Sequence, residues 1–128
     1  MNLHGRSWLA LGCISAAIGV AAGAFGAHGL KSTLSPAMLV TYETAVRYQM
    51  YHAFGLIAAG LAAGFIPASK LKLVGWCFAA GTLLFSGSLY LLTLTDILWL
   101  GAVTPLGGLA FIAGWVMFGY FMYQKQPG

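Results

Sequence analysis

Four long apolar segments, separated by short polar ones, dominate the chain. They cover approximately residues 7–27, 36–66, 71–93 and 97–123. A helix needs about 20 predominantly apolar residues to cross the hydrocarbon core of a bilayer, and each segment reaches that length. Strands are disfavoured, because an open sheet edge in lipid leaves backbone groups without hydrogen-bond partners. The pattern predicts an all-α protein, a four-transmembrane-helix bundle that forms a single membrane domain over residues 1–128.

Residues with capping and turn preferences separate the segments. Ser35 followed by Pro36 is typical of an N-cap with proline in the first helical turn, so the second helix is expected to begin there. Gly26 and Gly29 are candidates for the end of the first helix, and Asp96 is a candidate N-cap for the fourth. All the connections are short, which predicts that consecutive helices are antiparallel neighbours.

Small residues recur at helical spacing and predict the faces through which the helices pack. In lipid, helices associate through close van der Waals contact and hydrogen bonds, so small side chains mark interfaces. One stripe on the first helix holds Gly12, Ala16, Gly19, Gly23 and Ala27. One face of the third helix holds Gly75, Ala79, Thr82, Ser86, Tyr90 and Thr93. We expect one compact bundle, and the glycine stripe leaves homo-oligomerisation open.

Charge is scarce and scattered, which agrees with a membrane location. Only 6% of the residues are charged and 60% are hydrophobic, against about 25% charged residues in soluble domains. The basic residues do not cluster on a face, which excludes a nucleic-acid partner. On the side of both termini lie Arg6, Lys70, Lys72 and Lys125, and on the other side lie Lys31 and Arg47. Because positive charge accumulates on cytoplasmic loops, both termini are predicted to be cytoplasmic.

Polar side chains concentrate in the half of the bundle that lies away from the termini. The candidate ligand-binding pocket in that half is lined by His28, Glu43, Arg47, Tyr48, Tyr51, His52, Ser86 and Tyr90. Glu43 and Arg47 have the spacing of an intrahelical ion pair, and His52 projects over the small-residue face of the second helix. A purely structural interpretation is equally open. A neutral His52 would then bond to a neighbouring helix, and the ion pair would lie at the interface.

Patterns that carry chemistry are missing from the sequence. Cys13 and Cys77 lie inside apolar segments, and no CxxC pair or Cys/His metal spacing is present. No nucleophile–base pair is evident either. We therefore predict no catalytic residue, metal site or cofactor, and no enzymatic activity. A haem held by His28 and His52 is kept as an alternative.

Four blocks of sequence resemble the YgdD/YwdK-like family of small four-helix membrane proteins, a domain of unknown function. The blocks are residues 23–30, 42–53, 85–90 and 104–108. They follow the family order and cover nearly the whole chain. The resemblance implies a multi-pass protein of the bacterial plasma membrane, which is the inner membrane in a Gram-negative cell. It implies no activity, cofactor or catalytic residue.

Three hypotheses for function follow from these features. The first is a non-enzymatic accessory or structural membrane subunit, because almost no residue lies outside the bilayer. The second is binding or transport of a lipid, quinone or small amphiphile in the polar pocket. The third is a haem or redox subunit. Expected partners are membrane lipids, another membrane protein or a second copy of the chain.

Overall fold

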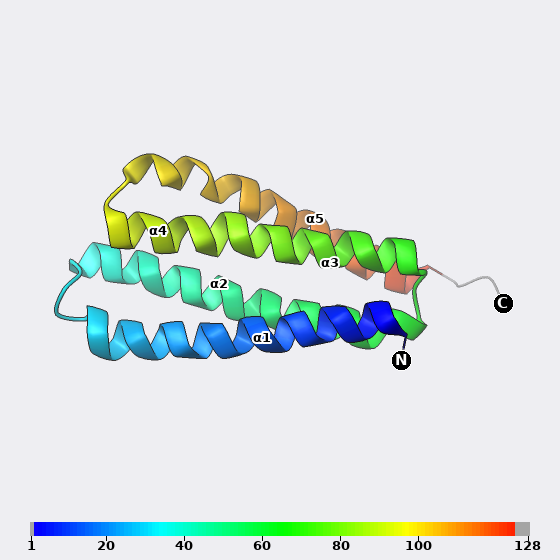
Figure 1. The fold of residues 1–128 in the computed structure, drawn as a ribbon. Helices are drawn as coiled ribbons and strands as arrows, with labels where there is room; N and C mark the ends of the chain where they lie inside the picture. Colours follow the sequence, from blue (N-terminus) through cyan, green and yellow to red (C-terminus); the bar gives the residue numbers. More distant parts are fainter. Residues whose placement is uncertain (1, 125–128) are drawn as a thin grey trace.

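Four antiparallel helical rods make up the protein in a computed structural model, which describes residues 2–124 (Figure 1). The start of the first rod, the connection between the second and third, and the end of the fourth lie at one end of the bundle, here called the terminal end. The opposite end is called the distal end. Lys125, one of the basic residues from which the cytoplasmic side is predicted, lies outside the described residues.

Side-chain caps begin the first two rods. α1 (Leu3–Phe25) starts four residues earlier than expected, because the side chain of Asn2 accepts a backbone N–H of the first turn at 2.8 Å. α2 (Pro36–Leu61) begins where the sequence predicts, and the Ser35 hydroxyl accepts the backbone N–H of Met38 at 3.2 Å. Each bond satisfies one of the amide groups that a helix start leaves unpaired.

The first rod does not end at its glycines. A π-helical turn, η1 (Gly26–Leu30), continues it past Phe25 and contains both Gly26 and Gly29. Gly26 is needed for packing, since a Cβ there would lie 2.5 Å from the ring of Tyr42 on α2. The prediction that Gly26 and Gly29 end this helix is therefore wrong. Their role is close approach, and their conformation is that of a right-handed helix.

The third rod is one helix with a π-helical turn inside it. A short 3₁₀ turn, η2 (Ala62–Gly64), ends the second rod. α3 (Ala68–Thr82) then passes through η3 (Leu83–Gly87) into α4 (Ser88–Thr95). Together these elements cover more residues than the predicted 71–93.

Asp96 ends α4 and does not cap the fourth rod, contrary to the prediction. It adopts the left-handed conformation with φ of 59°, and its backbone N–H donates to the carbonyl of Leu92 at 2.9 Å. The fourth rod starts as a 3₁₀ helix, η4 (Leu98–Ala102), and becomes α5 (Thr104–Tyr123). Pro105 lies in the first turn of α5, where a missing amide hydrogen costs nothing.

Glycines bring α1 into close contact with α2, as the small-residue stripe predicts. A Cβ at Gly12 would lie 2.7 Å from the carbonyl oxygen of Ala53, and one at Gly19 would lie 2.5 Å from the sulfur of Met50. Backbone-to-backbone approach of this kind maximises van der Waals contact between helices in lipid. Ala27 differs from the prediction, because it is exposed.

The hydrophobic core fills the terminal half of the bundle. Its members are Trp8, Leu56, Ala59, Ala63, Ile66, Leu71, Val74 and Phe78. In the distal half the buried side chains include Gln49, Ser86, Ser88 and Thr93. The sequence predicts this uneven distribution of polar groups along the bundle, and the structure confirms it.

Three helical segments are long and apolar enough to cross a membrane: Leu3–Leu30, Ala68–Thr95 and Leu98–Tyr123. The second rod is not among them, because its first half carries Glu43, Arg47 and several hydroxyl groups. It nevertheless runs beside the other rods over their length (Figure 1).

Candidate ligand-binding groove

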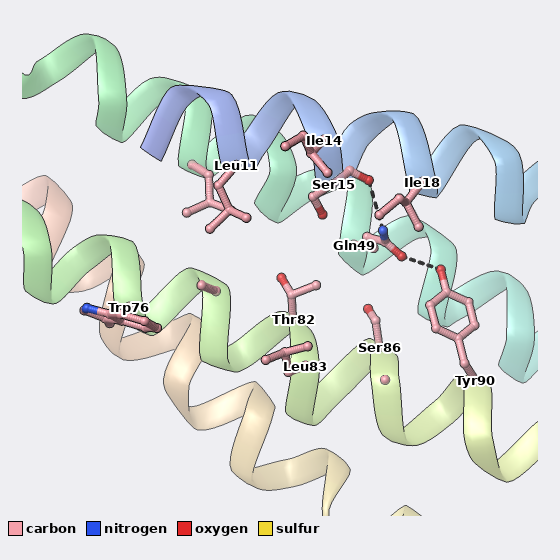
Figure 2. Close-up of a pocket in the computed structure, with 13 residues that line it drawn as sticks. Leu11, Ile14, Ser15, Ile18, Gln49, Trp76, Thr82, Leu83, Ser86 and Tyr90 are labelled. Carbon is pink, nitrogen blue, oxygen red and sulfur yellow. Dashed lines mark hydrogen bonds between the residues drawn. The ribbon is translucent and has the colours of Figure 1, made fainter. Parts of the chain in front are cut away.

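A groove opens on the side of the bundle between α1 and the third rod (Figure 2). Its volume is about 420 Å³, which is in the range of small-molecule sites. None of its lining side chains is charged. They are Leu11, Ile14, Ser15, Ile18, Gln49, Leu56, Trp76, Ala79, Thr82, Leu83, Ser86, Gly87 and Tyr90. The groove therefore suits the hydrocarbon part of a ligand.

The groove exists because α1 packs chiefly on α2 and meets α3 mainly near the terminal end. There the indole of Trp8 lies against Gly75, so closely that a Cβ at Gly75 would overlap the ring. Farther along, α1 presents Ile14 and Ile18, which are 58% and 56% exposed. Thr82 faces them with a short side chain (Figure 2), and the small Ala79 lines the same groove. Short side chains on one wall leave the space between the rods unfilled.

A hydrogen-bonded bridge closes the distal end of the groove. The Tyr90 hydroxyl donates to Oε1 of Gln49 at 2.6 Å, and Nε2 of Gln49 donates to the carbonyl of Ser15 at 2.9 Å (Figure 2). Gln49 is 5% exposed, so each bond satisfies a group that water cannot reach. The bridge joins α4, α2 and α1, and it is defined here as the distal bridge. The distal bridge sets a polar limit to an otherwise apolar groove.

The π-helical turn η3 forms part of the groove wall. It directs the buried hydroxyl of Ser86 toward α2, where it donates to the carbonyl of Ala45 at 2.7 Å. It also accommodates Gly107 of α5, where a Cβ would collide with the backbone nitrogen of Phe85. π-Helical turns inside α-helices are frequent at functional sites. Here the turn joins the groove wall to both α2 and α5.

His52 lies in a separate cluster between α2, α3 and α5, and it points into the bundle as predicted. It is 3% exposed and stacks on Phe111 with ring centroids 3.4 Å apart. The indole Nε1 of Trp115 is 2.9 Å from its Nε2, and its Nδ1 is 2.6 Å from the carbonyl of Tyr48. Indole can only donate, so Nε2 accepts and the proton lies on Nδ1. Nε2 therefore joins α2 to α5, and the Nδ1–H group donates within α2.

The eight residues predicted to form one pocket lie in four places. Ser86 and Tyr90 line the groove. Tyr48, Tyr51 and His52 are joined by ring contacts outside the groove, where the Tyr48 ring also stacks on Phe85 at 4.6 Å. A different hollow of about 340 Å³, on the α1–α2 face, is lined by Glu43 and Arg47, and His28 is exposed in η1.

Glu43 and Arg47 are both exposed. In the part of the chain that the structure describes, the Arg47 guanidinium donates to the hydroxyl of Thr44 at 3.4 Å, and it does not pair with Glu43. The expected ion pair is therefore not observed. An exposed pair of this type contributes little free energy, so a competing local hydrogen bond readily replaces it.

A haem between His28 and His52 does not fit the geometry. Gly26 packs on Tyr42, which places His28 near the distal end of α2. His52 is ten residues farther along α2 than Tyr42, roughly 15 Å at 1.5 Å per residue. A metal binds an imidazole nitrogen at about 2 Å, so one ion cannot reach both rings. Residues 2–124 hold no group of three or more side chains suited to a metal.

Sequence reasoning missed two residues of the distal bridge, Gln49 and Ser15. A signal for Gln49 is present in the spacing of the buried positions of α2, which alternate steps of three and four: Tyr42, Ala45, Gln49, His52, Leu56 and Ala59. A polar residue in such a seam is buried and needs partners. No comparable signal exists for Ser15, because its backbone carbonyl is the group that bonds.

Comparison with known proteins gives one consistent picture. Residues 22–108 match the model of a family described as "Protein of unknown function (DUF423)". The chain is 48% identical over 113 residues to the UPF0382 membrane protein YwdK of Bacillus subtilis, which covers 88% of this chain and 92% of that protein. A UPF0382 membrane protein of Staphylococcus saprophyticus is 47% identical over 112 residues, with the same two shares covered. No solved structure matches the chain.

Proposed function

Because the chain belongs to the DUF423 family, whose relatives are named UPF0382 membrane proteins, we propose that it is a non-catalytic membrane protein that holds a lipid chain. The site is the groove between α1 and the third rod. The observation that carries this proposal is the groove itself, with about 420 Å³ of space, an uncharged lining and a side opening. In a bilayer, lipid chains surround such an opening, so an occupant enters from the membrane.

Several features distinguish this groove from an ordinary gap between helices. Ile14, Ile18 and Leu83 form its rim with more than half of each side chain exposed. The distal bridge stops a chain at one end. The hydroxyl of Ser15 points into the groove (Figure 2) and makes no hydrogen bond within residues 2–124. A lined, closed-ended groove of this kind favours the amphiphile hypothesis over an accessory subunit, which stays a prediction.

The polar residues predicted to bind the amphiphile have a different role in this proposal. Ser86 and the distal bridge partner Tyr90 bond to α2 and fix the groove wall. The ligand then contacts mainly apolar side chains, and the polar groups determine where its chain stops. A quinone head would need donors, and in the lining these are limited to the Ser15 hydroxyl, the second N–H of Gln49 and the indole N–H of Trp76 among mostly apolar side chains, so a hydrocarbon chain fits the lining better.

We also infer that α2 crosses the membrane as a fourth span. Its 26 residues extend about 39 Å, which exceeds the hydrocarbon thickness of about 30 Å. Gln49 and His52, the polar side chains nearest the middle of the bundle, are buried among the other helices, and the exposed Glu43 and Arg47 lie in the first half of α2, toward the distal end. With four spans both ends of the chain lie on one side, and the excess of Lys and Arg there supports a cytoplasmic location in a bacterial plasma membrane. Reporter fusions at the C-terminus and in the 31–35 connection should report opposite sides.

Native mass spectrometry of the protein extracted in a mild detergent tests the lipid proposal. We expect a stoichiometric lipid mass on the wild-type protein. Ala79→Phe fills the groove and should remove that mass, whereas the control Ala113→Phe, at an exposed position on α5, should retain it. Far-UV circular dichroism confirms that both variants fold. Should Ala79→Phe misfold, Ile14→Trp at the exposed rim replaces it. Equal lipid occupancy in the folded groove variant and the control would refute the proposal.

A further inference from the structure

A second hollow lies next to the groove, toward the terminal end. This hollow has a volume of about 280 Å³ and is lined by His4, Ser7, Trp8, Leu11, Lys72 and Trp76. Leu11 and Trp76 line both spaces, so the two adjoin at these side chains. The two spaces, here together called the channel, have an uncharged part in the middle of the bundle and a basic mouth at the terminal end. That arrangement matches a molecule with a charged head and an apolar tail.

In the described residues, the charged side chains at the terminal end are all basic. Arg6, Lys70 and Lys72 lie there, whereas both acidic residues of the chain, Glu43 and Asp96, lie in the distal half. Within residues 2–124, no acidic side chain therefore lies at the terminal end to neutralise the mouth of the groove.

Lys72 differs from its neighbour Lys70 in how its amino group is used. Nζ of Lys70 donates to Oε1 of Gln124 at 2.7 Å and lies 5.0 Å from the centre of the Phe121 ring. Lys72 is exposed at the mouth of the groove and makes no hydrogen bond to other residues in the range 2–124. Its ammonium group is thus available to a ligand, and that of Lys70 is already bound.

We propose that the groove selects an anionic phospholipid, with its phosphate at Lys72 and one acyl chain running along the groove toward the distal bridge. This inference rests on the proposed function and names the class of lipid. The distance along the helix from Lys72 to Tyr90 of the distal bridge is about 27 Å, eighteen residues at 1.5 Å each. Half of a bilayer core is about 15 Å thick. One acyl chain from the leaflet at the terminal end therefore fits in the channel.

Electrostatics sets the size of the expected preference. A single Lys or Arg near the membrane surface raises the binding affinity for an anionic lipid about fivefold. The imidazole of His4 lines the same mouth and adds a donor when neutral. A zwitterionic lipid of the same chain length gains less at this mouth, because its own cation is repelled by Lys72.

Competition between two lipids tests the inference. The purified protein is equilibrated with micelles that contain equal amounts of phosphatidylglycerol and phosphatidylcholine with identical chains, and native mass spectrometry gives the ratio bound. We expect about fivefold enrichment of phosphatidylglycerol on the wild-type protein. Lys72→Gln should reduce the ratio to about one. The matched control Lys70→Gln removes the same charge from the same end and should keep the enrichment.

The outcomes separate this inference from the proposed function. If one lipid binds and is lost in Ala79→Phe, but the wild-type protein shows no preference, the groove holds a lipid and the anionic selection is refuted. If Lys70→Gln lowers the ratio as much as Lys72→Gln, the effect is one of overall charge and the assignment to Lys72 is refuted. If no lipid is bound in the groove at all, both proposals fail.

Discussion

Replacing Gly12 with alanine should separate α1 from α2 and destabilise the bundle. The added Cβ would lie 2.7 Å from the carbonyl oxygen of Ala53, and 2.8 and 2.9 Å from Cγ1 and the backbone nitrogen of Ile57. Two of these three atoms belong to the backbone of α2 and cannot rotate away. To restore ordinary contact at 3.4 Å from the present 2.7 Å, the helices must move apart by about 0.7 Å at this point.

The size of the effect follows from two opposing terms. A gap of 0.5–1 Å forfeits about a quarter to a half of each local dispersion contact, and overpacking of this kind costs about 1–3 kcal/mol. Alanine is favoured over glycine within a helix by about 0.5–1 kcal/mol, which offsets part of the loss. We expect Gly12→Ala to lower the free energy of unfolding by about 1–2 kcal/mol.

Gly119 on α5 is a matched control, because nothing lies within 4 Å of a Cβ placed there. Gly119→Ala should raise the free energy of unfolding slightly through helix propensity alone. Both variants can be compared by titration with a denaturing detergent in mixed micelles, followed by far-UV circular dichroism. A Gly12→Ala variant as stable as Gly119→Ala would refute the close approach of α1 to α2 at this position.

Two further predictions concern hydrogen bonds that join the rods. Trp115→Phe removes the one hydrogen-bond partner that Nε2 of the buried His52 has within residues 2–124. It should cost about 1–3 kcal/mol, measured by the same titration. If the midpoint of the denaturation curve of that variant equals the wild-type midpoint, the bond does not hold α5 to α2. Tyr90→Phe removes the donor to Gln49 and should cost about 0.5–1.5 kcal/mol. The cost should disappear when Gln49 is already replaced by leucine, and a cost that persists in that background would contradict the distal bridge.

The features that sequence reasoning predicts well depend on local or strictly periodic signals. The N-cap at Ser35 needs only its immediate neighbours. The contact role of Gly12 and Gly19 follows from helical spacing in a lipid setting. The burial of His52 follows from the face on which it lies. In each case one helix contains all the information required.

The features that were missed depend on partners far away in the sequence. The distal bridge needs Ser15, Gln49 and Tyr90 from three rods, so no one segment indicates it. The turn η3 is fixed by the contact of Gly107 with Phe85, more than twenty residues away. The predicted pocket rests mainly on the depth of its polar residues. Residues close in depth can still face different sides of α2, as the buried Gln49 and the exposed Tyr51 do.

The π-helical turn η3 has a consequence for insertions and deletions in this chain. Such a turn holds one residue more than the α-helix that could replace it, so α3 and α4 are offset by about 100° relative to an uninterrupted helix. Deleting one residue from Leu83–Gly87 would convert the turn into ordinary α-helix and leave the residues beyond it on the same faces. Tyr90 would then still meet Gln49. A deletion in the regular α-helix of α3 would instead rotate α4 by about 100° and change which of its faces meets lipid, while leaving hydropathy and predicted topology almost unaltered.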